Sequence, residues 1–172
     1  MACVEKGIEH ELVPVSYGSD AHGELHPFRR MPILEIDGRM IFETLAITGH
    51  LDEAFEGPAL QPETHAERLR MWTWMGVCAD YLFREVVRGI PRDRPATETE
   101  LSGARAALVG AEGMLQGDRF LAGETLTLAD LYLAPQIANC HEKAPELLGG
   151  LEGLGRFMTI MGERESFRLT QP

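Results

Sequence analysis

The sequence predicts a small mixed α/β unit followed by an all-helical bundle. Three observations lead to this fold class: two short apolar runs joined by a turn dipeptide, a linker rich in Pro and Gly after them, and apolar residues spaced by three and four through the rest. A chain of 172 residues has room for one domain or two small ones. We therefore expect a first domain over residues 1–55, a linker over 56–62 and a helical domain over 63–172.

The elements at the N-terminus are short. Residues 1–6 are predicted to form a helix that ends at Gly7. A helix of this length is marginal by itself, so we expect the chain to begin inside an element whose front part is absent. The segment 10–15 suits a short strand at the edge of a sheet, because Pro14 cannot donate a hydrogen bond to a neighbouring strand.

A β-hairpin is the clearest element of the first domain. Apolar runs at 33–36 and 40–42 flank Asp37 and Gly38, a dipeptide that favours a two-residue turn. A loop over 16–30 precedes this hairpin. A helix whose apolar residues repeat every four positions follows it.

The second domain is predicted to contain helices over about 63–88, 101–115 and 151–164, with another that begins near Thr127. Both tryptophans of the first helix, Trp72 and Trp74, are expected to pack in the core, with a cleft or a partner as the alternative for Trp74. Its core-facing residues are predicted to be Leu69, Trp72, Gly76, Ala79, Phe83 and Val86.

A capping box is predicted at the start of the helix near Thr127. The Thr127 side chain would accept the Asp130 amide, and the Asp130 carboxylate would reach back to Thr127. Leu126 and Leu131 occupy the two positions of a hydrophobic staple. We interpret this motif as structural, with no part in the chemistry.

Composition excludes several classes of function. The net charge of −11 argues against nucleic acid and anionic membrane surfaces as partners. Three cysteines without a CxxC motif give neither a disulfide framework nor a zinc ribbon, and they favour a reducing cytoplasmic location. No apolar run is long enough to span a membrane, and no signal-peptide pattern is present. The histidines lack metal-ligand spacing and the glycine-rich nucleotide motifs are absent, so no metal or nucleotide cofactor is expected.

Two residue pairs are candidates for a binding site. Met31-Pro32 enters the first hairpin strand, where a cis bond would leave the preceding backbone open to an extended ligand. From the residues alone, an ordinary trans proline remains the alternative. Glu43-Thr44 opens the helix after the hairpin, where backbone amides hold anions and Glu43 can accept an ammonium group. The alternative there is a plain helix cap.

Together these segments resemble the soluble, bacterial-type glutathione S-transferase family. HPFRRMPILEIDGRMIFETLAI (26–47) is similar to the family's segment from its cis-proline strand through its Glu-Ser/Thr pair. FLAGETLTLADLYLAP (120–135) is similar to the capped motif of its helical domain. MACVEKGIEHELVPV (1–15) looks like the end of its first helix and its second strand.

The resemblance implies a thioredoxin-like domain that lacks its first strand, followed by an all-helical domain. It implies that Met31 pairs its backbone with the cysteinyl part of glutathione and that Pro32, cis throughout the family, holds this geometry. Glu43 and Thr44 would bind the γ-glutamyl end. Arg30 is a weaker candidate for the glycyl carboxylate.

The function implied is a cytoplasmic, homodimeric transferase that binds glutathione as a substrate and conjugates its thiolate to small hydrophobic electrophiles, as in detoxification. The electrophile pocket would lie between the domains, lined partly by the helix that holds Trp72 and Trp74. Two alternatives stay open: a non-catalytic binding or dimerisation module, and a glutathione-dependent thiol reductase.

The chain departs from the family pattern at two places. A free thiol has a pKa of about 8.5, so little thiolate is present at pH 7. Family members lower this pKa with a hydroxyl or thiol at the start of the first helix, which falls before the equivalent of Met1. We therefore expect the catalytic residue upstream, Cys3 not to replace it, and glutathione binding to persist better than turnover. Arg29, where a Gly is usual, is the milder departure.

Overall fold

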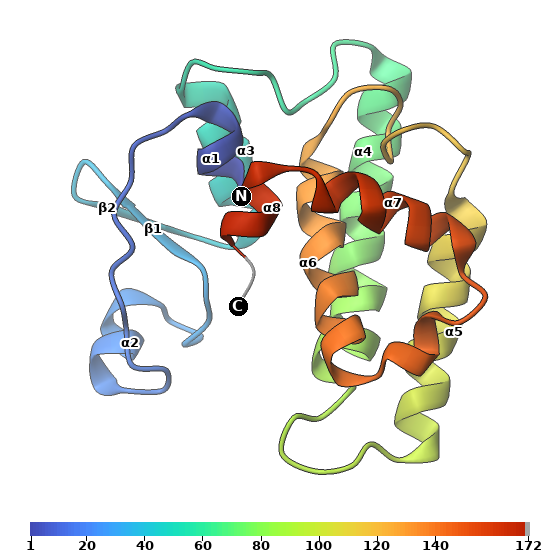
Figure 1. The fold of residues 1–172 in the computed structure, drawn as a ribbon. Coiled ribbons are helices and arrows are strands. Elements are labelled where there is room, and N and C mark those ends of the chain that lie inside the picture. The colour runs from blue at the N-terminus through green and yellow to red at the C-terminus, as the bar shows by residue number, and fades with distance from the viewer. Residues whose placement is uncertain (171–172) are drawn as a thin grey trace. The chain divides into compact units, whose positions relative to one another are not determined.

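The computed structural model describes residues 1–170. The chain forms two compact units: one covers Ala2–Pro58, and the other begins at Ala59 (Figure 1). The division falls within the segment 56–62 that the sequence marks as a linker. Each unit is described by itself below.

The N-terminal unit contains three helices and a two-stranded sheet. Its elements are α1 (Ala2–Lys6), α2 (Asp20–Leu25), β1 (Ile33–Ile36), β2 (Arg39–Phe42) and α3 (Thr44–Ala54). Helix α1 ends as the sequence predicts, because Gly7 adopts a φ of 66°. The Gly7 amide then donates to the Val4 carbonyl and the Ile8 amide to the Cys3 carbonyl, the pattern of a Schellman cap.

The predicted hairpin is confirmed. Strands β1 and β2 pair antiparallel, with Ile33 opposite Phe42 and Ile36 opposite Arg39. Asp37 and Gly38 both have positive φ, 49° and 71°, as a type I′ turn requires. The turn chemistry at these two positions is therefore sufficient to set the register of the hairpin.

The prediction of a strand over 10–15 is wrong. This segment carries no regular secondary structure, and Leu12 and Val13 are 86% and 71% exposed. A strand exists only where another strand satisfies its backbone, and within residues 1–170 the sheet consists of β1 and β2 alone. The segment therefore has no neighbouring strand with which its backbone could pair, despite its β propensity.

A buried ion pair joins α1 to α3. The Lys6 ammonium donates to Asp52 Oδ1 at 3.1 Å and to the Pro58 carbonyl at 3.2 Å. The side chains of Lys6 and Asp52 are only 1% and 6% exposed. Gly57, with a φ of 117°, lies against the Lys6 backbone so closely that a Cβ there would come within 2.6 Å of the Lys6 carbonyl oxygen. One lysine thus connects both ends of this unit.

The second unit is helical. It consists of α4 (His65–Val77), the π-helix η1 (Cys78–Arg88), α5 (Glu98–Met114), α6 (Leu128–Lys143), the 3-10 helix η2 (Pro145–Leu148), α7 (Glu152–Gly162) and α8 (Glu165–Leu169). Its core lies where α4, η1, α5 and α6 pack against one another. Helix α6 contributes more buried residues than any other helix, including Leu128, Leu133, Ile137 and Cys140.

The predicted core face of the long helix is largely wrong, although Val86 is buried as predicted. Leu69, Trp72 and Phe83 are exposed, Trp72 by 43%, whereas Trp74 is 3% exposed. The buried face carries Met71, Trp74, Met75, Cys78, Leu82 and Val86. Apart from the adjacent pair Trp74 and Met75, these positions also follow one another at intervals of three and four, so apolar spacing alone fits two faces of this helix. Packing against α5 and α6 decides between them.

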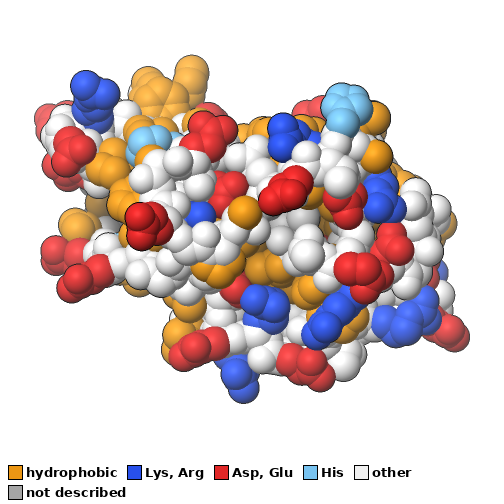
Figure 2. Space-filling model, turned by 90° about the horizontal axis from the view of Figure 1, so that it is seen from above, with side chains coloured by type: hydrophobic (Ala, Val, Ile, Leu, Met, Phe, Trp, Pro, Cys, Tyr) orange, Lys and Arg blue, Asp and Glu red, His pale blue; other side chains and the backbone are white. Residues whose placement is uncertain are grey.

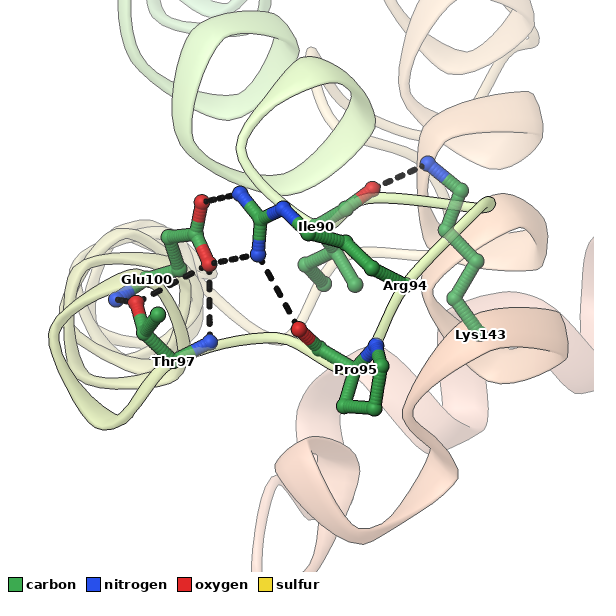
Figure 3. Close-up of polar contacts among 6 residues, drawn as sticks. All are labelled: Ile90, Arg94, Pro95, Thr97, Glu100 and Lys143. Atoms are coloured by element: carbon green, nitrogen blue, oxygen red, sulfur yellow. Dashed lines mark hydrogen bonds and ion pairs between the residues drawn. The ribbon is translucent and has the colours of Figure 1, made fainter.

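The start of α5 is capped by a small cluster of polar groups (Figure 3). The Thr97 amide donates to Glu100 Oε2 at 2.8 Å, and the Glu100 amide returns a bond to the Thr97 hydroxyl. The Arg94 guanidinium donates to both carboxylate oxygens of Glu100, with Nη2–Oε1 at 2.5 Å. Arg94, aided by Thr97, lowers the pKa of Glu100 to about 2, so this carboxylate stays ionised.

Lys143, near the end of α6, caps the end of η1 (Figure 3). Its ammonium donates to the Val87 carbonyl at 2.7 Å and to the Ile90 carbonyl at 2.8 Å. A cation here satisfies carbonyls that a helix leaves without partners at its end. Burial, with nearby Arg92, lowers the pKa of Lys143.

Asp130 binds two separate segments at the start of α6. Its Oδ2 accepts from the Thr127 amide at 2.7 Å and from the Thr127 hydroxyl at 2.8 Å, which places it in the predicted cap. Its Oδ1 accepts the Leu121 amide at 2.8 Å, a contact that the motif did not predict. Burial raises the pKa of Asp130 to about 6, and these hydrogen bonds oppose the shift.

Glu112 of α5 caps the start of α7. Its two carboxylate oxygens accept the amides of Gly153 and Leu154 at 2.7 and 2.8 Å. A Cβ at position 153 would come within 2.8 Å of the Glu112 carboxylate. The glycine therefore leaves room for a carboxylate from another helix.

Candidate functional site

The hairpin brings the two predicted residue pairs together. Since Ile33 lies opposite Phe42, Pro32 and Glu43 each lie one position beyond the same end of the ladder. Opposed residues of an antiparallel pair have Cα atoms about 4.5–5.5 Å apart. Pro32 therefore immediately precedes β1, with Met31 before it, and Thr44 opens α3 at the same edge of the hairpin. The Met31–Pro32 peptide bond is cis, the geometry that the resemblance implies.

Glu43 has an uncommon backbone conformation. It is the residue before α3, with φ 74° and ψ 122°, and its side chain is exposed and makes no capping hydrogen bond. A non-glycine residue at such a φ costs about 1–3 kcal/mol and is concentrated at functional sites. Thr44, the first residue of α3, is half-buried, and the first-turn amides of a helix are suited to an anion. The pair can thus offer an acceptor for a cation beside donors for an anion.

Arg30 lies directly before Met31, on the loop that leads into β1. Its Nη1 donates to the Tyr17 hydroxyl at 2.9 Å, and its backbone carbonyl accepts from His22 Nε2 at 3.1 Å. The guanidinium is exposed to solvent. Tyr17 and His22 were not predicted from the sequence, because a tyrosine in a loop and a histidine without metal spacing belong to no motif.

Arg29 has a backbone conformation that is uncommon for a residue with a side chain. Its φ is 49°, in the left-handed region that glycine tolerates best. The side chain offsets this conformation by donating to the carbonyls of Gly18 and Ser19 at 2.6 and 3.1 Å and by pairing with Asp20 at 3.5 Å. The Arg29 side chain therefore links the end of this loop to the segment 18–20 at the start of α2.

The two buried cysteines do not supply a nucleophile near neutral pH. Cys78 is fully buried in the helical unit, where desolvation and the charge of Asp130 raise its pKa to about 12. Desolvation, with Glu146, raises the pKa of Cys140 to about 11. Cys3 is half-buried on α1. A thiol must ionise to react, so the two buried cysteines are inert.

Within the described part of the chain, no group of three or more His, Cys, Asp or Glu side chains is placed to hold a metal ion. None of the helices over residues 1–170 combines the length and the apolar character needed to cross a membrane. On the face shown in Figure 2, basic side chains are interspersed with acidic ones.

Both units match models of known protein domains. Residues 1–59 match the model of the glutathione S-transferase N-terminal domain, and residues 73–165, more than half of the chain, match that of the C-terminal domain.

Among curated proteins, the chain is 26% identical to glutathione S-transferase 3 of Zea mays over 187 residues, covering 96% of this chain and 83% of the relative. It is 27% identical to the maleylacetoacetate isomerase of Rattus norvegicus over 154 residues, covering 82% of this chain and 71% of the relative.

Solved structures share the fold. A glutathione S-transferase of Methylobacillus flagellatus, solved with GSH bound, superposes with a TM-score of 0.84 at 20% identity, covering 99% of this chain and 91% of that one. The expected fold is therefore confirmed: a thioredoxin-like N-terminal domain with a small antiparallel sheet, followed by a helical C-terminal domain.

Proposed function

Because the chain belongs to the glutathione S-transferase family, we propose that its N-terminal unit binds glutathione and that the protein transfers the glutathione thiolate to small hydrophobic electrophiles. The observation that carries this proposal is the exposed Glu43 carboxylate, held at φ 74° at the start of α3 and beside the end of β1 that Met31 and Pro32 enter. A zwitterionic γ-glutamyl group requires this combination of an acceptor and helix-terminal donors.

Each site residue has a role in this proposal. Glu43 accepts the ammonium of the γ-glutamyl end, while Thr44 and the first amides of α3 bind its carboxylate. The Met31 backbone pairs with the cysteinyl part, and Pro32 positions that backbone. Arg30 faces the glycyl carboxylate as a cation. These interactions fix the peptide so that its sulfur is presented in one orientation.

Replacing Glu43 with Ala should raise the dissociation constant of glutathione at least tenfold, which corresponds to the loss of about 1.4 kcal/mol from one charge-assisted hydrogen bond. Isothermal titration calorimetry measures this change. Glu53→Ala is the matched control, since Glu53 is an exposed glutamate of the same helix, and it should bind as the wild type does. Unchanged affinity in Glu43→Ala would remove Glu43 from the site.

A second candidate activity is a glutathione-dependent isomerisation, favoured by the similarity to maleylacetoacetate isomerases. Side-by-side assays of maleylacetoacetate isomerisation and of conjugation to a generic aryl halide separate the two activities. The thiol reductase alternative is less well supported, because Cys78 and Cys140 are buried with raised pKa values.

We also propose that the protein is a homodimer that works in detoxification in the reducing cytoplasm. The exposed apolar side chains of Leu69, Trp72 and Phe83 along α4 and η1 support this proposal, because a second copy could cover them. Sedimentation velocity should give about twice the chain mass of 19.1 kDa. A monomer at micromolar concentration would exclude the dimer and leave the binding site untouched.

A further inference from the structure

The Arg30 guanidinium is held by a neutral partner. Its Nη1 donates to the Tyr17 hydroxyl at 2.9 Å, and no carboxylate of residues 1–170 forms an ion pair with it. The neighbouring Arg29, by contrast, pairs with Asp20. A guanidinium has five N–H donors, and a phenol that accepts one of them leaves both the charge and the remaining donors available. Arg30 is therefore oriented without being neutralised.

A buried histidine fixes the backbone on both sides of this contact. The His22 ring is 0% exposed, and its Nδ1 accepts the Gly18 amide at 3.1 Å. Nδ1 therefore carries no proton, so the neutral ring has its proton on Nε2, which donates to the Arg30 carbonyl at 3.1 Å. One imidazole thus connects the residue after Tyr17 to Arg30 itself.

The Tyr17 ring is also placed by His22. The two ring centroids lie 5.2 Å apart with an interplanar angle of 49°. Tyr17 is otherwise 67% exposed, so this ring contact and the bond from Arg30 are what orient its hydroxyl. The His22 bond to the Arg30 backbone, the ring contact with Tyr17 and the Tyr17 hydroxyl together orient the Arg30 guanidinium.

We propose that Tyr17 and His22 are positioning residues that hold the Arg30 guanidinium ready for the C-terminal carboxylate of the thiol peptide, and so make the site select glutathione over peptides that lack the glycine. This inference rests on the proposed function, because it concerns the same site. An arginine side chain that is already held in place loses less conformational entropy when it binds a carboxylate than a freely moving one does.

Tyr17→Phe tests the proposal, since it removes one oxygen and keeps the ring on His22. Calorimetry with glutathione and with γ-glutamylcysteine, which lacks the glycyl carboxylate, gives the selectivity. We expect Tyr17→Phe to weaken glutathione binding about three- to tenfold and to leave γ-glutamylcysteine unchanged. Tyr81→Phe, at an exposed tyrosine of η1, is the matched control and should change neither.

A double-mutant cycle separates positioning from a general structural effect. Arg30→Gln should reduce the affinity for glutathione to that for γ-glutamylcysteine. In the Arg30→Gln background, Tyr17→Phe should cause no further loss, because the group that Tyr17 positions is gone. His22→Leu should lose the same selectivity, with thermal unfolding measured to confirm that the variant is folded. If it does not fold, the cycle between Tyr17 and Arg30 still decides.

The outcomes distinguish this inference from the proposed function. Equal weakening of both peptides by Tyr17→Phe, or no weakening of either, overturns the positioning role. Additive losses in the cycle overturn it as well. If Glu43→Ala fails to weaken either peptide, the proposed glutathione site itself is wrong. If Glu43→Ala weakens both peptides while Tyr17→Phe alters neither, the site stands and the inference fails.

Discussion

Lys6→Met should lower the free energy of unfolding of the N-terminal unit by about 3–5 kcal/mol, the cost of breaking a buried ion pair by removing one partner. The substitution keeps most of the side-chain volume but removes the ammonium that contacts Asp52 and the Pro58 carbonyl. The Asp52 carboxylate, 6% exposed, then loses the cation that neutralises it. Hydrogen exchange of α1 and α3 amides, followed by mass spectrometry, reports the opening of this unit.

Two further variants show whether the charge pair is the cause. Lys6→Met combined with Asp52→Leu should recover most of the loss, because replacing both members of a buried pair by apolar groups is often nearly neutral. Glu53→Gln, at the exposed position next to Asp52, should leave exchange unchanged. Both tryptophans belong to the other unit, so a stable fluorescence signal would show that the helical bundle remains folded. Wild-type exchange in Lys6→Met would contradict the prediction.

Asp130→Asn should destabilise the helical unit by about 3 kcal/mol at pH 7. Both carboxylate oxygens of Asp130 accept backbone amides, from Leu121 and from Thr127. An asparagine has only one acceptor, so its NH₂ group must face one of these amides and leave a buried donor without a partner. Urea denaturation followed by tryptophan fluorescence measures the loss. Asp80→Asn, at an exposed position in η1, is the control and should change stability by no more than about 0.5 kcal/mol.

The same variant gives a pH dependence. The pKa of Asp130 in the folded protein is about 6, above the ordinary value of 3.8. The folded state therefore binds this proton more tightly than the unfolded state, and the stability gained from protonation is fully present below about pH 4 and is lost as the pH rises through 6. Since Asp130→Asn does not titrate, the stability advantage of the wild type over it should be larger at pH 5 than at pH 7. An equal or smaller advantage at pH 5 would contradict the raised pKa.

Local sequence signals predicted the elements whose geometry is itself local. The turn at Asp37 and Gly38 needs two residues that tolerate positive φ, and the cap between Thr127 and Asp130 closes within one helical turn. Gly7 ends α1 for the same reason. In each case the residues that decide the conformation are the residues that adopt it.

The features that were predicted wrongly or not at all depend on residues that lie far apart in the sequence. The segment 10–15 has strand propensity, but no strand pairs with it. The long helix presents two apolar faces, and only its packing shows that Trp74 is buried and Trp72 exposed. The Lys6–Asp52 pair spans 46 residues, which no short motif encodes.

The arrangement of the candidate site could be predicted in part for the same reason. Pro32 and Glu43 lie together because the hairpin, which the sequence predicts, aligns them. The contacts of Arg30 with Tyr17 and His22 depend instead on how an irregular loop folds back on itself. Residue type gave no signal for them, because neither side chain belongs to a recurring motif.

Burial of two of the three thiols has a consequence if the protein handles electrophiles, as we propose. Compounds that react with glutathione also alkylate protein cysteines, and the attack requires access and a thiolate. Cys78 and Cys140 have neither, with no exposed surface and pKa values of about 12 and 11. The helical unit is thereby shielded from modification by such compounds. The extent of alkylation of Cys78 and Cys140 after a fixed time therefore reports how often this core opens, because each buried thiol reacts only when the packing around it is transiently lost.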